Sequence, residues 1–138
     1  MFFQTKFGVF REVVYLCVRM RNCIQIDQGK VSVKVSVFIF KDGKSWIAFC
    51  PSLDLSGYAT TEKGAKKDFT WMLQDWLNTQ ISSKSLEQDL KQQDWIVGKG
   101  KWSEPDVKEL LSKNDLMDFV IDQPRFVKTD VEAVAYCQ

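Results

Sequence analysis

The sequence predicts an α+β fold: a two-layer core of the order β-β-β-α-β, followed by a C-terminal helical pair and a final strand. Three observations carry this prediction. Residues 31–40 alternate apolar and polar side chains, which is typical of a half-buried strand. An Asp-Gly pair joins this run to a second β-rich run and indicates a hairpin. Apolar side chains between residues 65 and 77 recur at helical spacing, which indicates an amphipathic helix.

Composition excludes several classes of function. The chain of 138 residues has a net charge of +1, so no overall field attracts it to nucleic acid or to a membrane. It contains no histidine, which excludes histidine triads, general bases and metal ligands. Its four cysteines lack C-x-x-C spacing, which argues against zinc, and they are too few for a disulfide scaffold. We therefore expect free thiols in a reducing cytoplasm, no metal and no cofactor, and we interpret Cys50 as a packing residue.

Residues 1–22 are predicted to be an N-terminal extension. Its most apolar part, residues 7–18, contains two charges and is shorter than the roughly 20 residues of a membrane span. It also lacks the pattern of a signal peptide. Three interpretations stay open: a basic amphipathic arm for a membrane surface or a partner, a poorly packed extension, or a segment upstream of a true start at Met20. The basic character of such an arm would come from Lys6, Arg11, Arg19 and Arg21. Glu12 is the one acidic residue in this segment.

The first predicted strand, residues 31–40, has two different faces. Odd-numbered side chains from Val31 to Ile39 form one apolar face, while the opposite face becomes apolar only at Phe38 and Phe40. That two-sided end predicts that the strand runs into a covered region or an oligomer contact.

The next two strands are short. Asp42-Gly43 predicts a type I′ turn, because both of its positions need positive φ. The second strand spans residues 45–50 and ends at Pro51, which cannot donate a ladder hydrogen bond. A third strand over residues 56–60 is predicted to be bulged at Gly57.

One long helix is predicted after the third strand. Thr60 or Thr61 is a suitable N-cap, and the helix extends to about residue 79. We interpret the aromatic side chains of its apolar stripe as core rather than as a platform for stacking on bases. The stripe consists of Ala65, Phe69, Met72, Leu73, Trp76 and Leu77.

Shorter elements complete the predicted core, which spans residues 23–100. Ser85 and Gln88 match a capping box that begins a short helix. Residues 94–97 are predicted to be a fourth strand, and residues 98–102 a flexible turn with two lysines.

Residues 101–138 are predicted to be a C-terminal appendage of two helices and a strand. The strand, residues 126–136, is expected on a sheet edge. Acidic residues outnumber basic ones in the helical pair, which opposes a DNA-reading role because such helices repel phosphates. The first helix is predicted from a Ser103 or Glu104 cap with Pro105 in its first turn, and the second from Leu116, Phe119 and Val120.

The carboxylates of the sequence do not predict an active site. Asp42 and Asp54 lie in predicted turns, and Asp68 and Asp75 lie on the polar side of the long helix, whereas two-metal hydrolysis needs several converging carboxylates. Phosphate-loop, nucleophile-elbow and dinucleotide motifs are missing from the sequence. We therefore expect no enzyme activity, and we interpret Asp54 as a turn residue rather than a catalytic one.

The middle of the chain, residues 31–97, resembles the HicB-type antitoxins. Their recurring pattern is aromatic-x-Ala-x-x-Pro-x-Leu, a turn with glycine, and then Thr and a Glu-Ala pair that open a helix. Two departures are the Asp54-Leu55 pair in place of Pro-Gly, and Gly64 in place of Glu. The matching positions are Trp46, Ala48, Pro51, Leu53, Gly57, Thr61 and Ala65.

The resemblance implies a non-catalytic interaction protein of a toxin–antitoxin system, built on a degenerate ribonuclease H-like fold. It also implies a small basic toxin ribonuclease as the partner and assembly into dimers or larger oligomers. Typical members end in a DNA-binding module, so the acidic tail makes this chain resemble a divergent stand-alone branch. The alternative is an RNA- or DNA-binding regulator. Its candidate contacts are Lys99, Lys101 and Trp102, which a flexible turn explains equally well.

Overall fold

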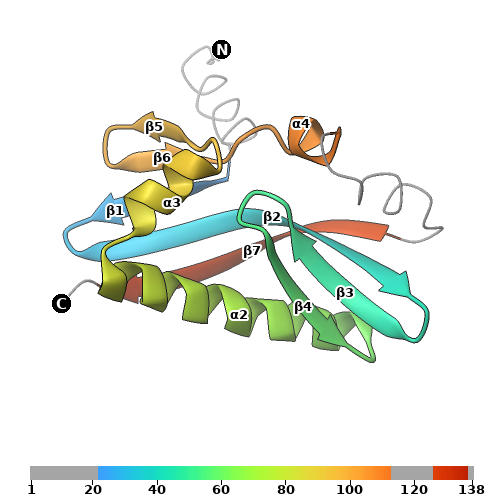
Figure 1. Ribbon diagram of the computed structural model, residues 1–138. Helices are drawn as coiled ribbons and strands as arrows, with labels where there is room; N and C mark the ends of the chain where they lie inside the picture. Colours follow the sequence, from blue (N-terminus) through green and yellow to red (C-terminus); the bar gives the residue numbers. More distant parts are fainter. Residues whose placement is uncertain (1–21, 113–125, 137–138) are drawn as a thin grey trace, which may run out of the picture.

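The computed structural model describes residues 22–112 and 126–136, and it shows an α+β protein whose seven strands form one antiparallel sheet (Figure 1). The predicted α+β class is therefore confirmed. Along the chain the elements are β1 (Cys23–Asp27), β2 (Lys30–Asp42), β3 (Ser45–Cys50), β4 (Leu55–Ala59), α2 (Glu62–Ser83), α3 (Leu86–Gln92), β5 (Ile96–Gly98), β6 (Lys101–Ser103), α4 (Val107–Ser112) and β7 (Phe126–Tyr136).

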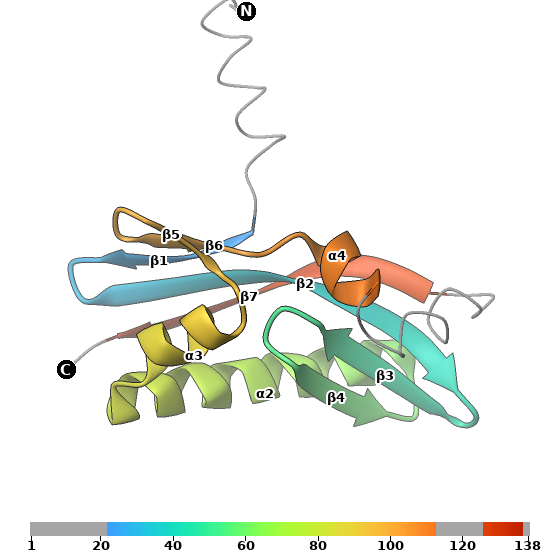
Figure 2. The ribbon, with the colours of Figure 1, turned by 45° about the horizontal axis from the view of Figure 1, so that its top comes forward.

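β2 is the centre of the sheet. It pairs with β7 along one edge over residues 30–40. Along the other edge, residues 30–33 pair with β1 and residues 38–42 pair with β3. β4 extends the sheet beyond β3, and β6 and β5 extend it beyond β1. Figures 1 and 2 show these extensions as two wings at opposite ends of β2.

The two faces of β2 differ as the sequence predicts. Odd-numbered side chains from Val31 to Ile39 are buried in the main core together with α2. On the opposite face Phe38 and Phe40 are also buried, and Phe40 forms a second, smaller cluster with Phe49. The two-sided end of the strand therefore runs into a covered region, which confirms the first of the two expected explanations.

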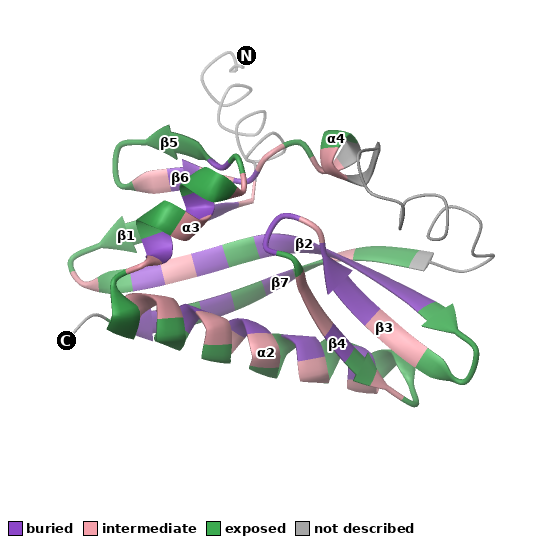
Figure 3. Cartoon of the chain, viewed as in Figure 1, coloured by how far each residue is buried: buried purple, intermediate pink, exposed green. Residues whose placement is uncertain are grey.

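α2 covers the core face of the sheet with one buried stripe (Figure 3). Thr61 is its N-cap: the hydroxyl accepts a hydrogen bond from the Gly64 N–H at 3.0 Å. The helix ends at Ser83 rather than near residue 79, because Lys84 adopts the left-handed conformation with φ 58. The stripe consists of Ala65, Phe69, Leu73 and Leu77.

β1 and β6 are two strands that the sequence analysis does not predict. β1 joins β2 through Gln28 and Gly29, whose φ values of 50 and 82 fit a type I′ turn. β6 replaces the predicted flexible turn and pairs with β1. The turn after β2 also differs from its prediction. Asp42 pairs with Ser45, and within the two-residue loop only Gly43 has a positive φ, which is the pattern of a type II′ turn.

One of the two predicted caps of the shorter helices is right in position, and the other is wrong. Ser85 is the N-cap residue of α3, which ends at Gln92, but its hydroxyl donates to Gln80 Oε1 at 2.7 Å and makes no cap bond, so the predicted capping box does not form. α4 begins at Val107, beyond Pro105, and Glu104 is a buried residue rather than a cap. The predicted fourth strand, residues 94–97, is the edge strand β5, which begins two positions later.

Several predictions concern residues outside the described part of the chain. These are the extension over residues 1–21 with Met20, and the second helix at residues 116–120. The final strand is confirmed as β7, which pairs with β2 alone among the described strands. The domain division after residue 100 stays a prediction; β6 and β7, which both follow it, belong to the same sheet as β1 and β2.

Candidate functional site

The residues of the antitoxin-like pattern meet at the corner formed by β3, β4 and α2. Ala48, Leu53 and Ala65 are buried in the core, and Trp46 packs against it. Their side chains are apolar and come from three different elements, so burying them stabilises the corner as a unit. These positions therefore have packing roles.

Glycine is required at position 57 by a close approach between β4 and α2. A Cβ there would lie 2.5 Å from the Phe69 nitrogen and 2.8 Å from the Phe69 Cα. The pairing of β4 with β3 is continuous through Gly57, so the predicted bulge is wrong. Asp54 lies in the turn between Pro51 and β4 with φ 55, a left-handed conformation that aspartate tolerates in turns.

Glu104 fills a gap between the two wings of the sheet. Ser36 lies between the residues of β2 that pair with β1 and those that pair with β3. The Ser36 N–H donates to Glu104 Oε2 at 3.0 Å, and the Ser36 hydroxyl donates to Oε1 at 2.8 Å. A carboxyl group thus takes the place of a neighbouring strand.

Glu104 also binds two further segments of the chain, one through its carboxyl group and one through its backbone. Ser52 Oγ donates to Glu104 Oε2 at 2.5 Å. The Glu104 N–H donates to the Asn22 carbonyl at 2.8 Å, and Asn22 Nδ2 donates to Ser36 Oγ at 2.9 Å. Glu104, Ser36 and Ser52 are all buried, so each hydrogen bond satisfies a group that water does not reach. The network fastens the chain after β6 to β2 and to the turn after β3.

Cys50 lies beside this network, with its Sγ 3.3 Å from Ser52 Oγ. Burial raises the pKa of the Cys50 thiol to about 12; the hydrogen bond to Ser52 acts in the opposite direction, and the charge of Glu104 adds to the rise. The thiol is fully buried and protonated at neutral pH. These observations fit the interpretation of Cys50 as a packing residue.

The shifted pKa of Cys50 predicts that alkaline pH destabilises the fold. Between pH 9 and about 12 the folded protein keeps the thiol proton, while the unfolded chain, with the ordinary pKa of 9.0, has lost it. The unfolded state then binds fewer protons, so the free energy of unfolding falls by about 1.4 kcal/mol per pH unit in this window. Urea unfolding of the wild type and of Cys50→Ala, from pH 8 to 10.5, measures the effect.

Cys50→Ala is expected to show the smaller loss of stability over that range, and the difference between the two proteins isolates the effect of the thiol. Parallel pH profiles of the two proteins would contradict the prediction.

Side chains of α2 also reach two of the outer strands of the sheet, β4 and β7. Asp68 Oδ2 accepts a hydrogen bond from the Tyr58 N–H of β4 at 2.9 Å. Gln74 Nε2 donates to the Val134 carbonyl of β7 at 3.0 Å. Both backbone groups belong to edge strands, and a satisfied edge group is a poorer template for adding another strand.

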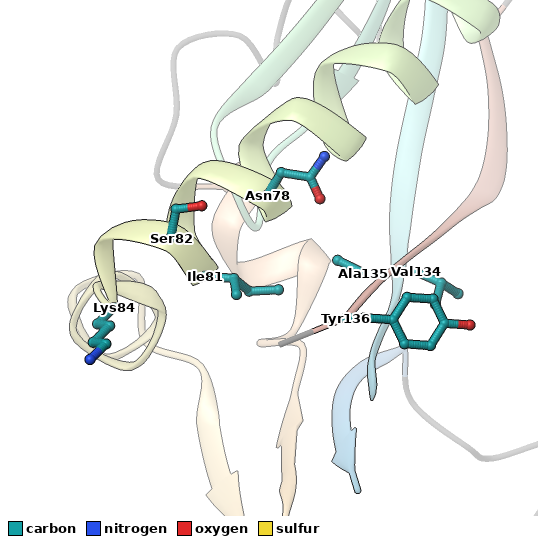
Figure 4. A pocket seen from close by; sticks show the side chains of 7 residues that line it. All are labelled: Asn78, Ile81, Ser82, Lys84, Val134, Ala135 and Tyr136. Atoms are coloured by element: carbon teal, nitrogen blue, oxygen red, sulfur yellow. The ribbon is translucent and has the colours of Figure 1, made fainter. Parts of the chain in front are cut away.

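A groove lies between the last turns of α2 and the end of β7 (Figure 4). Its volume is about 710 Å³. In Figure 4, Ile81 of the helix and Ala135 of the strand face each other across it. Two apolar residues of the groove remain accessible: Val134 is 40% exposed and Tyr136 is 67% exposed. The full lining consists of Asn78, Ile81, Ser82, Lys84, Val134, Ala135 and Tyr136.

The predicted nucleic-acid contact is only partly accessible. Trp102 is 7% exposed and belongs to the main core, so its ring is not available for stacking on a base. Lys99 lies in the β5–β6 turn and is exposed, and Lys101 is half-buried. A nucleic-acid role for this hairpin would depend on the two lysines alone.

The sequence does not predict that Glu104 is a buried hydrogen-bonding residue, or that Trp71 is exposed. No periodic pattern marks Glu104, which follows a three-residue strand and precedes a proline. Trp71 does carry a signal, because it falls outside the apolar stripe of its helix and is 65% exposed. A single exposed apolar residue is common on protein surfaces, so Trp71 is a candidate for binding only together with the side chains around it.

The comparisons with known proteins add no relative. No protein-family model matches the sequence, and no curated protein or solved structure is significantly similar to it. Within the described residues, no three His, Cys, Asp or Glu side chains form a group that could hold a metal ion. No helix in the described ranges is long and apolar enough to cross a membrane.

Proposed function

We propose that this protein is a non-catalytic interaction protein of the antitoxin type, which binds a small basic toxin ribonuclease and assembles as a homo-oligomer. The resemblance to HicB-type antitoxins motivates the proposal. The observation that carries it is the corner of β3, β4 and α2, where the matching positions have packing roles. At Gly57 and Thr61 the residue type itself is needed, for a close approach and for a helix cap. The residues of the pattern thus hold the scaffold together. We infer that binding is left to side chains on the surface of this scaffold.

The groove of Figure 4 is the surface best suited to a protein partner. Asn78 and Ser82 of α2 line one wall, and Tyr136 and Val134 at the β7 rim offer exposed apolar area on the side of the strand turned away from the helix (Figure 4). An exposed aromatic side chain at the rim of a groove can anchor a partner, because it buries a large area with few rotatable bonds. A partner side chain that enters the groove would contact both α2 and β7.

The test is purification of the tagged full-length chain from its own host in mild salt, followed by mass spectrometry and light scattering of the eluate. We expect a stoichiometric small basic protein and a complex with more than one copy of the tagged chain. Tyr136→Ala is expected to lower recovery of the partner roughly tenfold.

Tyr58→Ala is the matched control, since Tyr58 is 60% exposed on β4, away from the groove. Recovery of a monomeric tagged chain with no stoichiometric protein would contradict the proposal. Equal losses in both tyrosine variants would contradict the assignment of the groove.

The alternative of an RNA- or DNA-binding regulator gains no support from Lys99, Lys101 and Trp102, because Trp102 is buried. The solvent side of helix α2 is better suited to nucleic acid than this hairpin, because it carries exposed lysines and the exposed Trp71.

A further inference from the structure

The first half of α2 carries basic and aromatic side chains on its solvent side. Lys63, Lys66 and Lys67 are exposed, and Trp71 is 65% exposed. The protein has five tryptophans, and Trp71 is the one that lies mostly in solvent. The others are buried or half-buried: Trp46, Trp76, Trp95 and Trp102. Tryptophan is highly buried on average, although rarely completely, so Trp71 differs from the other four.

Helical spacing places these four residues together. Lys63, Lys67 and Trp71 are four residues apart and lie on one side of the helix. Lys66, three residues after Lys63, flanks this side toward β7, where it contacts the Thr129 hydroxyl. We call this surface the lysine–tryptophan ridge, made of Lys63, Lys66, Lys67 and Trp71. The ridge points away from the buried stripe of α2, which packs on the sheet.

The ridge is unfavourable for the helix itself. Lysines in the first turns meet the positive end of the helix dipole, and like charges three and four residues apart repel each other. Among the described residues, no carboxylate forms an ion pair with these three lysines; Lys66 Nζ contacts the Thr129 hydroxyl at 3.3 Å. The nearby Asp68 carboxylate is bound to the Tyr58 N–H. Glu62 in the first turn, four residues before Lys66, offsets part of this cost. The positive charge that remains on the exposed lysines is available to an anionic ligand.

We propose that the lysine–tryptophan ridge binds single-stranded nucleic acid. The three lysines can bind the phosphates of a flexible single strand, which does not require an exact spacing between the positive charges. The exposed Trp71 indole offers a face on which an unpaired base stacks. The neighbouring polar side chains are already engaged within the protein: the Thr70 hydroxyl donates to the Lys66 carbonyl, and Gln74 Nε2 donates to the Val134 carbonyl. The ridge therefore offers charge and stacking rather than contacts that read a base sequence. An acidic protein could pair with the same lysines, and poly-glutamate is therefore included as a competing ligand. This binding surface is separate from the groove and does not depend on a toxin partner.

The probes are fluorescein-labelled oligo-U RNA and oligo-dT DNA of about 15 nucleotides, titrated with the full chain by fluorescence anisotropy. We expect saturable binding at 50 mM salt. Three phosphate contacts on a single strand predict a slope of about −2 in log affinity against log salt, or a loss of about 20-fold between 50 and 200 mM salt. Stacking should also quench the fluorescence of Trp71.

Two variants test the two components separately. Trp71→Ala is expected to weaken binding about 5- to 150-fold with little change in the salt slope. The triple variant Lys63→Gln, Lys66→Gln, Lys67→Gln is expected to bring the slope close to zero. All four side chains are exposed, so both variants should fold.

Matched controls carry the same chemical changes elsewhere. Tyr58→Ala removes another exposed aromatic ring, and Lys41→Gln, Lys44→Gln, Lys91→Gln removes three other exposed lysines. Both controls are expected to bind like the wild type. The proposal is overturned by absence of binding at 50 mM salt, by equal losses in ridge and control variants, or by poly-glutamate binding as tightly as oligo-U with no effect of Trp71→Ala. Equal affinity for a blunt DNA duplex would overturn the assignment to single strands.

Discussion

Glu104→Ala is expected to lower the free energy of unfolding by at least about 3 kcal/mol. The substitution leaves the Ser36 N–H and the hydroxyls of Ser36 and Ser52 without their acceptor in a buried site. A buried donor without a partner costs about 1–3 kcal/mol, and three such donors share one carboxyl group here. Urea unfolding followed by tryptophan fluorescence measures the change.

Glu87→Ala is the control for loss of a carboxylate, because Glu87 makes an exposed ion pair with Lys91 and should cost less than about 1 kcal/mol. Hydrogen exchange locates the effect: the Ser36 amide should exchange faster in Glu104→Ala while its neighbours in β2 stay protected. Ser52→Ala should cost less in the Glu104→Ala protein than in the wild type, since the two groups share one hydrogen bond. Additive costs would mean that the carboxyl group does not act through Ser52.

Features with a period were predictable from the sequence. The alternation from Val31 to Ile39 gives the central strand and its buried face, and the four-residue spacing of the stripe from Ala65 to Leu77 gives the long helix. Thr61 as N-cap follows from local hydrogen-bond chemistry. These elements are specified by residues close to one another along the chain.

Features set by long-range partners were not predictable in the same way. β6 has three residues and becomes a strand because β1 and β5 pair with it on either side. Glu104 looks like a helix cap in sequence, next to Pro105, and its true partner Ser36 is 68 positions away. Short strands and buried polar networks are decided by tertiary contacts, which a periodic pattern does not record.

The two candidate binding surfaces show the same contrast between features set by local sequence and features set by long-range contacts. Trp102 follows two lysines and suggests a stacking site, but its position between β1 and β5 buries the ring. Trp71 lies in the same helix as the core residue Phe69, yet its phase turns it to solvent. Helical phase is readable from sequence, so Trp71 was within reach of prediction, whereas the burial of Trp102 depends on the pairing of three strands.

Gly57→Ala is expected to lower the free energy of unfolding by about 3 kcal/mol or more. The added methyl group would lie 2.5 Å from the Phe69 nitrogen, closer than any real contact of this kind, and 3.0 Å from the Ala65 carbonyl oxygen. These are backbone atoms of α2, so relief requires the whole helix to move away from β4. Thermal and urea unfolding of the variant measure the cost.

Gly98→Ala is the matched control, because Gly98 is exposed and a methyl group there would meet only the Lys101 carbonyl oxygen at 3.3 Å. It should cost less than about 1 kcal/mol. Trimming the Phe69 side chain should not rescue Gly57→Ala, since the collision is with backbone, and rescue by Phe69→Leu would contradict this explanation. Glycine at the position shared with the antitoxin pattern is thus expected to be a requirement of helix–strand packing, which any protein with this corner must meet whatever its surface binds.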